Sequence, residues 1–372
     1  MAVKLFPLGT HGVVFTLMAI VIASVIVVSS SVLMDSGKQT DTSPDHIRVQ
    51  VVDSIINSFQ SYAESALRVS VFYGLNNLTN ILANQTDDDM ELYFANLDAL
   101  EGNLSNCILH TNRPIGPSGA GAWDSSCHNK KTIPVMLQNF SEQVKDNLNI
   151  DLFFIIDNSS FNIWEEFPFE ATANLTMNIT VIDSRASWNI TNFYIETNVP
   201  LDGLQDPVTT KLKYTKLTQS NFPIYYFNKT NSPYGKEELY SMITQHTFTS
   251  SISAPSILQR FVGDFKNDTC GPPPDFNGGS CGVESFIDGT RIKWSEWPAQ
   301  RHNYTHVDYE LFVSDPPGGA FFPRSVVCDS GSSRVYAVNF TNDESDDKNM
   351  FWANSSVLAR LNVSSSQWLS CP

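Results

Sequence analysis

The sequence predicts an α+β protein with an N-terminal transmembrane helix, a long amphipathic helical stalk, and then a mainly antiparallel β domain with disulfides. Three observations predict this architecture. An apolar run occupies residues 13–34. Apolar residues then recur at steps of three and four from about residue 44 to 85, which indicates a helix. From about residue 149, apolar and polar residues alternate in segments rich in Phe, Ile, Thr and Val, which is typical of strands.

The apolar run Val13–Met34 meets the requirement for a membrane span. It holds 22 residues without Asp, Glu, Lys or Arg, and a bilayer core of about 30 Å needs about 20 helical residues. Lys4 precedes the run and acidic residues follow it, so the positive-inside rule places the N-terminus in the cytoplasm. A cleaved signal peptide is the alternative, and its apolar core is typically shorter, about 7–15 residues.

A further alternative concerns the start of the apolar run. Gly12 followed by VVFTLMAIVIA resembles the processing site of type IV pilin-like proteins. Cleavage there would leave Val13 as the first residue. This resemblance implies a filament subunit, in which the hydrophobic helix packs against copies of itself instead of lipid.

Fourteen N-x-S/T sequons support an external location for the chain after the membrane segment. This is more than chance gives for such a composition, and N-linked sugars imply an exposed, external site. A chain rich in Asn, Ser and Thr also creates some sequons without any function. The acceptor residues are Asn77, Asn84, Asn103, Asn139, Asn158, Asn174, Asn178, Asn189, Asn228, Asn267, Asn303, Asn339, Asn354 and Asn362.

Six cysteines also lie after the membrane segment, which fits an oxidising compartment. Sequence alone cannot choose among the possible pairings. Proximity favours three disulfides, and the rival interpretation, a zinc site, lacks any CxxC or paired Cys/His spacing. The three favoured pairs are Cys107 with Cys127, Cys270 with Cys281, and Cys328 with Cys371.

The chain divides into four predicted regions. Residues 1–12 form a cytoplasmic N-terminus, 13–34 the transmembrane helix, 43–148 the helical stalk region, and 149–372 an extracellular β-rich domain. The apolar stripe of the stalk must be covered by its own domain or by a neighbouring subunit.

Three helices are predicted within the stalk region. The first begins at Ser43-Pro44-Asp45, where a capping hydroxyl precedes proline, and runs to about Gln85. The second begins at the acidic cluster Asp87–Asp89 and ends near Gly102. The third covers Pro134–Asn147, after a loop over residues 106–132.

The β-rich region contains segments of both patterns. Two helical segments, EELYSMITQ and APSILQRFVGDF, interrupt the strands. The predicted strands are LFFIID, FEATANLTMNITVID, SWNITNFYIETNVPL and KLKYTKL before these helices, and HVDYELFV, RVYAVNF and SSVLARLNV after them.

Composition excludes two classes of protein. The net charge is −16 over 372 residues, and a nucleic-acid-binding protein needs a basic surface instead. The aromatic content of 12% excludes a chain that is disordered throughout.

No segment carries a recognisable catalytic or metal-binding motif, so we expect a protein that is not an enzyme and uses no cofactor. Cys328-Asp329-Ser330-Gly331 is similar to a serine-protease nucleophile turn, but none of the seven histidines stands in a partner motif. His302 and His306, near Asp308, would bind a metal only if helical, and their segment alternates like a strand. Acidic clusters such as Asn342–Asp347 lack EF-hand spacing.

An aromatic-rich stretch offers one candidate binding surface. Exposed aromatic side chains stack on sugars or anchor protein partners, although packing in the core is the simpler role. The residues are Trp294, Trp297 and Tyr304.

Several motifs, in order along most of the chain, resemble those of archaeal single-pass membrane-anchored surface proteins of unassigned function. The motifs are FTLMAI from Phe15, ALRVSVFYGL from Ala66, SWNITNFYIETNVPLDGLQDP from Ser187, GVESF from Gly282 and HVDYELF from His306. The resemblance implies an archaeal cell surface and an envelope role, without assigned catalytic residues.

The sequence therefore predicts a non-enzymatic, membrane-anchored, glycosylated cell-surface protein that mediates contact or envelope assembly. It would be a single-pass protein of the cell membrane with its C-terminal domain outside. Its partners would be the membrane and other envelope or surface proteins, including copies of itself, and no nucleic acid. The alternative is a type IV pilin-like filament subunit.

Overall fold

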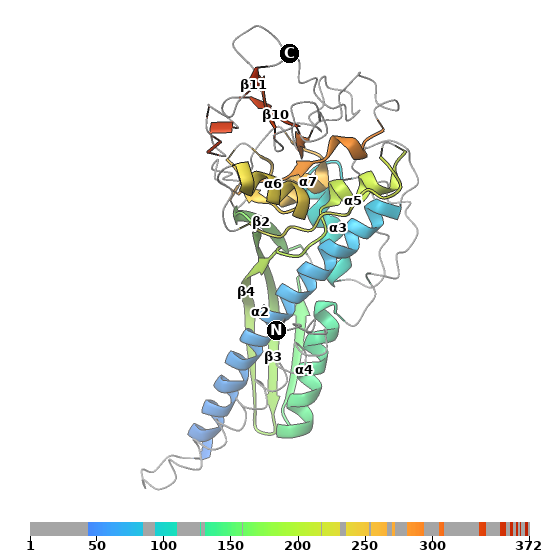
Figure 1. Cartoon of the computed structure of the whole chain (residues 1–372). Helices are drawn as coiled ribbons and strands as arrows, with labels where there is room; N and C mark the ends of the chain where they lie inside the picture. Colours follow the sequence, from blue (N-terminus) through green and yellow to red (C-terminus); the bar gives the residue numbers. More distant parts are fainter. Residues whose placement is uncertain are drawn as a thin grey trace, which may run out of the picture.

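The computed structural model shows an elongated molecule, with a helix-and-hairpin rod at one end and a head of short elements at the other (Figure 1). The apolar run Val13–Met34, the aromatic residues Trp294, Trp297 and Tyr304, and Cys328 and Cys371 lie outside the described residues. The structure describes residues 44–84, 94–109, 127, 131–157, 159–216, 218–230, 236–252, 254–265, 270–271, 281–293, 305–308, 335–339, 350–354, 358–359, 362–363, 365 and 369–370.

Helix α2, Pro44–Asn84, is the backbone of the rod and confirms the predicted long helix. One side of this helix is exposed and polar, with residues such as Asp53 and Gln60. Buried apolar residues recur along its whole length at steps of three and four, and all belong to one hydrophobic core: Val52, Ile55, Phe59, Ala63, Ala66, Val71, Leu75 and Leu78. The stripe is therefore covered by the protein's own domain, as the simpler of the two alternatives predicts.

The sheet beside α2 is antiparallel throughout and is built on one long hairpin. Strands β3, Glu170–Asp183, and β4, Ala186–Pro200, pair along their full length and turn at residues 184–185. On its other edge, β3 pairs first with β2, Asn162–Phe167, and then with β1, Asp151–Ile156. Strands β1, β3 and β4 confirm predicted segments, whereas β2 was not predicted.

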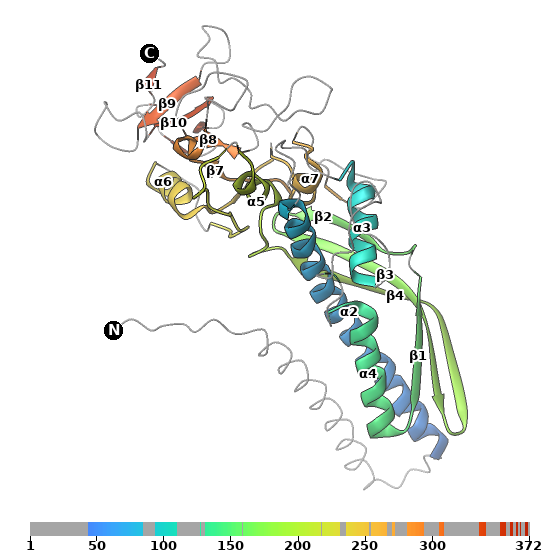
Figure 2. The same ribbon diagram turned by 90° about the vertical axis from the view of Figure 1, so that its right-hand side faces the viewer.

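The two faces of this sheet differ sharply in chemistry. Helices α2 and α4, Ile133–Leu148, cover one face (Figure 2), here called the inner face. Residues of β3 alternate, so that Leu175, Met177 and Ile179 are buried against these helices. The even-numbered residues of this stretch, Asn174 and Asn178 among them, lie on the opposite face, here called the outer face.

Helix α3, Leu97–Leu109, packs against α2 at an unusually close point. A Cβ on Gly74 would lie 2.6 Å from Leu104 Cδ1, so a larger residue would force the Leu104 side chain to shift. The helix begins after Asn96, whose Oδ1 accepts from Ala99 N at 2.8 Å, and it does not end near Gly102 as predicted. Gly102 stands on the exposed side of the helix with nothing within 4 Å, so it does not stop the helix.

The head is defined here as the chain from residue 201 onward, and three short helices are among its described elements. They are α5, Pro207–Tyr214, α6, Lys236–Gln245, and α7, Ile257–Val262. Helices α6 and α7 confirm the two predicted helical segments. The predicted strand KLKYTKL is wrong, because Asp206 caps α5 by accepting from Thr209 N at 3.0 Å and proline follows at the first helical position.

The strands of the head are short and antiparallel. Strand β5, Thr249–Ser250, pairs with β6, Val283–Glu284, and β7, Phe286–Ile287, pairs with β8, His306–Val307. A third small sheet contains β9, Val335–Asn339, between β10, Met350–Asn354, and β11, Leu369–Ser370. The positions of β8 and β9 agree with the predicted strands, whereas β10 was not predicted.

The predicted strand SSVLARLNV is wrong at the residues that the structure describes. Leu358 and Ala359 are helical, and Asn362 has φ 54°. Val363 N donates to Leu358 O at 3.0 Å, and Asn362 N donates to Ala359 O at 3.0 Å. This pair of hydrogen bonds is the Schellman motif, in which a left-handed residue closes the end of a helical turn.

The predicted fold class is confirmed in its coarse form: helices, antiparallel sheet and disulfides. Cys107–Cys127 and Cys270–Cys281 are bonded as proximity suggested. Helix gives way to strand near residue 149, but the helices before it and the strands after it share one hydrophobic core. Among the described residues, no helix is long and apolar enough to cross a membrane.

Candidate functional site

The most strongly charged interior site of the described chain is a buried cluster in the head, centred on Arg260 of α7. Its Nε donates to Asp206 Oδ1 at 2.9 Å, and its Nη2 donates to Asp206 Oδ2 at 3.1 Å. The same Nη2 lies 2.8 Å from Asp308 Oδ2, which also accepts from Ser285 Oγ at 3.0 Å. All three charged side chains have an exposed fraction of 0%.

One cation serves two carboxylates in this cluster, and the pKa values follow from that. Burial raises the pKa of Asp308, and the opposing effects of Arg260 and the Ser285 hydrogen bonds do not cancel it. Burial alone would lower the pKa of Arg260, but the charges of Asp206 and Asp308 outweigh burial and raise it. Arg260 therefore stays charged at all ordinary pH values.

Aromatic rings complete the surroundings of the guanidinium. The Cζ atom of Arg260 lies 5.8 Å from the ring centre of Phe227 and 5.4 Å from that of Phe248. Tyr225 stacks on His246 with ring centres 4.4 Å apart. Burial raises the pKa of Tyr225 far above its usual value, so it stays protonated. The cluster is closed to solvent, and it joins α5, α7 and the segment after β8 rather than presenting a reactive group.

A small pocket lies between α3, β2 and α7 and contains two carboxylates, Glu101 and Glu165. Glu101 Oε2 accepts from Ile163 N at 3.3 Å, and burial raises the pKa of this carboxyl. The space available to water-sized molecules is about 30 Å³. That is room for a water molecule and not for an organic substrate.

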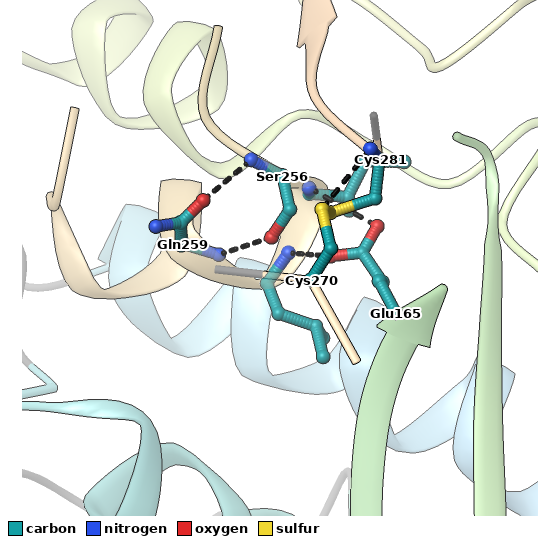
Figure 3. Close-up of a disulfide and its surroundings, with 7 residues drawn as sticks. Glu165, Ser256, Gln259, Cys270 and Cys281 are labelled. Carbon is teal, nitrogen blue, oxygen red and sulfur yellow. Dashed lines mark hydrogen bonds between the residues drawn. A yellow bond between two sulfur atoms is a disulfide. The ribbon is translucent and has the colours of Figure 1, made fainter. Parts of the chain in front are cut away.

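Glu165 has a structural role at this pocket. Its two carboxylate oxygens accept from Ile257 N at 3.2 Å and Leu258 N at 2.8 Å, the first backbone groups of α7 (Figure 3). Ser256 and Gln259 add a reciprocal capping box at the same helix end. The disulfide Cys270–Cys281 lies beside Glu165 and closes this corner of the head (Figure 3).

The residues considered for metal binding do not form a site in the described part of the chain. His306 lies in β8, in agreement with the strand pattern, and Asp308 is bonded to Arg260 and Ser285. His302 lies outside the described residues. No group of three or more His, Cys, Asp and Glu residues is arranged to hold a metal ion among the residues described.

The sequons differ in accessibility. Five described acceptors are exposed: Asn139, Asn178, Asn189, Asn228 and Asn362. Three are half-buried: Asn77, Asn103 and Asn174. Asn84, Asn339 and Asn354 lie in described elements without a described side-chain environment, and Asn158, Asn267 and Asn303 lie outside the described residues.

Three of these sequons share the outer face of the sheet. Asn174 and Asn178 project from β3, and Asn189 projects from β4. Asn174 is hydrogen-bonded to Asn162 and Tyr194, and Asn189 accepts a hydrogen bond from Thr180. Asn178 accepts one from the backbone N–H of Asn192. The outer face is thus polar along its centre, opposite the face that the helices cover.

Two apolar side chains stand out at the edge of this polar face. Phe153 and Ile155 of β1 have exposed fractions of 55% and 72%. Ile182, on the neighbouring strand and the same face, is 39% exposed. These three residues, here called the β1 patch, form the apolar border of the sequon-bearing face.

Sequence reasoning identified the sequons and missed the buried charge cluster. Asp206 could have been found from the Asp206-Pro207 dipeptide, which begins a helix. Arg260 had no such signal, because an isolated arginine in an amphipathic segment is usually exposed.

Comparison of the chain with protein-family models, curated proteins and solved structures finds no match.

Proposed function

We propose that this chain is a non-enzymatic, membrane-anchored, glycosylated cell-surface protein that mediates contact or envelope assembly. The observation that carries the proposal is the outer face of the sheet, where three sequons lie together opposite the helix-covered face. A hydrated sugar layer suits a face that none of the described helices covers. The resemblance of the sequence motifs to archaeal surface proteins supports the same function.

The long axis of the molecule gives this proposal a direction. Arg48 Nη1 lies 2.7 Å from Asp183 Oδ2, so the start of α2 is tied to the tip of the β3–β4 hairpin. The head lies at the other end of the rod (Figure 2). Residues 35–43 alone separate the apolar run from α2. An anchor at residues 13–34 therefore attaches at the hairpin end, and the head is presented away from the membrane.

The interior of the described chain supports a binding role over catalysis. Three buried carboxylates, Asp206, Asp308 and Glu165, all accept hydrogen bonds that hold helices or strands in place. A catalytic acid or base needs access to a substrate, and the pocket beside Glu165 admits only water-sized molecules.

A type IV pilin-like filament subunit is the second candidate. The position of α2 favours it, because this helix is the first described element and begins at the end of the molecule opposite the head. An apolar helix attached there could pack in the centre of a filament, with the sheet and the head facing outward.

N-terminal sequencing of the protein from its native membrane distinguishes the candidates. A start at Met1 supports the anchored surface protein. A start at Val13 supports the filament subunit, and electron microscopy should then find fibres. A start beyond about residue 30 contradicts both, since neither works without the apolar helix.

A further inference from the structure

We propose that Asn178 and Asn189 carry N-linked glycans whose first sugars lie over the β1 patch, so that the sugars cover Phe153 and Ile155. This inference depends on the proposed function, because it needs an external chain that meets a glycosylation machinery. It adds to that function which sequons are used and what the attached sugar contacts.

The strand register places the apolar side chains directly beside the sequons. Ile155 is the cross-strand partner of Asn178, and Phe153 is the partner of Thr180. Thr180 in turn is opposite Asn189 on β4. Opposite residues of an antiparallel pair have Cβ atoms about 4.5–5.5 Å apart. A sugar on Asn178 therefore begins next to the exposed face of Ile155.

The hydrogen bonds of the two asparagines leave the reactive atom available. Asn178 Oδ1 accepts from Asn192 N at 3.0 Å, and Asn189 Oδ1 accepts from Thr180 Oγ1 at 2.8 Å. In each case the amide oxygen is held by the sheet. The Nδ2 atom, which bears the sugar in an N-glycan, makes no hydrogen bond within the described chain.

The third sequon of this face provides the contrast. Asn174 is half-buried, and its Nδ2 donates to the Tyr194 hydroxyl at 3.1 Å. Its Oδ1 accepts from Asn162 Nδ2 at 3.0 Å. Both ends of this amide are therefore occupied by the sheet, and a sugar would break the contact with Tyr194. We expect Asn174 to stay unmodified in the folded protein.

A bulge brings Asn178 into this position. The register of β3 and β4 shifts between Met177 and Ile179, so β4 contributes an extra residue opposite Asn178. Asn192 adopts φ 56° there, which directs its backbone N–H to the side chain of Asn178. Phe193 and Ile190 both stay on the inner face as a result, where they pack against the core.

The β1 patch has the properties of a surface that benefits from a cover. Strand β1 is an edge strand, which among the described strands pairs only with β3. An edge strand with exposed apolar side chains favours pairing with other chains. The apolar C–H faces of a sugar ring pack on aromatic and aliphatic side chains, and its hydroxyl groups keep the surface hydrated.

Glycopeptide mass spectrometry on the full-length protein from its native host tests the choice of sites. The expected result is occupancy at Asn178 and Asn189 and none at Asn174. Sugars on other sequons with Asn178 and Asn189 unmodified would overturn this inference and leave the proposed function standing. Absence of sugar from every sequon would overturn the proposed function as well.

A variant series tests the contact with the patch. The variant Asn178→Gln, produced in the native host, should bind more of a fluorescent hydrophobic dye than the wild type. The matched control Asn228→Gln removes an exposed sequon in the head and should leave dye binding unchanged. In a Phe153→Thr/Ile155→Thr background, Asn178→Gln should have no further effect.

Two results would overturn the contact. Equal dye binding by glycosylated wild type and Asn178→Gln would mean that the sugar does not cover the patch. An increase that persists in the Phe153→Thr/Ile155→Thr background would mean that the sugar covers something else. Deglycosylation of the folded wild type should reproduce the Asn178→Gln result, which guards against a folding defect in the variant.

Discussion

Arg260 and Asp206 share two hydrogen bonds, of 2.9 and 3.1 Å, while the same Asp206 caps helix α5. The Asp206 carboxylate thus caps the start of α5 and accepts hydrogen bonds from Arg260 of α7. Asp308 pairs with the same Nη2 atom of Arg260 that donates to Asp206, and so connects the segment after β8 to the cluster. Arg260 thus links the start of α5, helix α7 and the segment after β8 in the interior of the head.

Replacing Arg260 with leucine should destabilise the protein by about 3–5 kcal/mol, because two buried carboxylates lose their partner. Urea denaturation followed by circular dichroism measures this loss. Arg291→Leu is the matched control, since its ion pair with Asp288 is partly exposed, and it should cost at most about 1 kcal/mol. Equal losses in the two variants would contradict the role given to Arg260.

The raised pKa of Asp308 predicts a specific dependence of stability on pH. The pKa of Asp308 is higher in the folded protein than in the unfolded chain, so the folded state holds this proton more tightly. The stabilisation from this proton is complete at a pH below the unfolded-state pKa. It is lost as the pH rises through the folded-state pKa. The wild type should therefore lose stability relative to Asp308→Asn as the pH rises from below about 4. Denaturation of both proteins across this range measures the difference, and a relative gain for the wild type would show that its pKa is lowered instead.

Gly74 predicts a steric effect at the contact between α2 and α3. Gly74→Ala places a Cβ 2.6 Å from Leu104 Cδ1, which should cost about 1–3 kcal/mol through overpacking. Gly102→Ala adds a methyl group to an exposed position of α3 and should stabilise the helix by up to about 1 kcal/mol. Thermal unfolding of the two variants should shift in opposite directions, and a shared direction would refute the close contact.

The disulfide Cys107–Cys127 should stabilise the protein by restricting the conformations of the unfolded chain. It joins residues 20 positions apart, and its loss in Cys107→Ser/Cys127→Ser should cost about 3 kcal/mol. The measurement is the free energy of unfolding without reductant. Adding reductant should lower the free energy of unfolding more in the wild type than in this double variant, because only the wild type has the Cys107–Cys127 bond to lose. An equal drop in the two proteins would contradict the prediction.

Local patterns predicted the elements whose burial is regular. Helix α2 buries one stripe and strand β3 buries every second residue, so period alone reveals them. Apolar and polar residues also alternate in the segment KLKYTKL. The segment is nevertheless helical up to Tyr214, because Asp206 caps a helix that begins at Pro207.

The buried charge cluster could not be predicted from sequence. Asp206, Arg260 and Asp308 are far apart in the chain, and only tertiary packing brings them together. The sequons were visible in the sequence, but not which of them are exposed. The half-buried Asn174 and the exposed Asn178 occupy the same face of one strand, and only the contacts of Asn174 with Tyr194 and Asn162 distinguish them.

The central claim is that the chain after the apolar run is an external, glycosylated and disulfide-bonded domain. The intact mass of the protein extracted from its native membrane, measured without reductant, tests it most directly. The account predicts a mass above that of the 372-residue chain by whole glycan units, with all six cysteines oxidised. A mass equal to the bare chain with free thiols would contradict the claim.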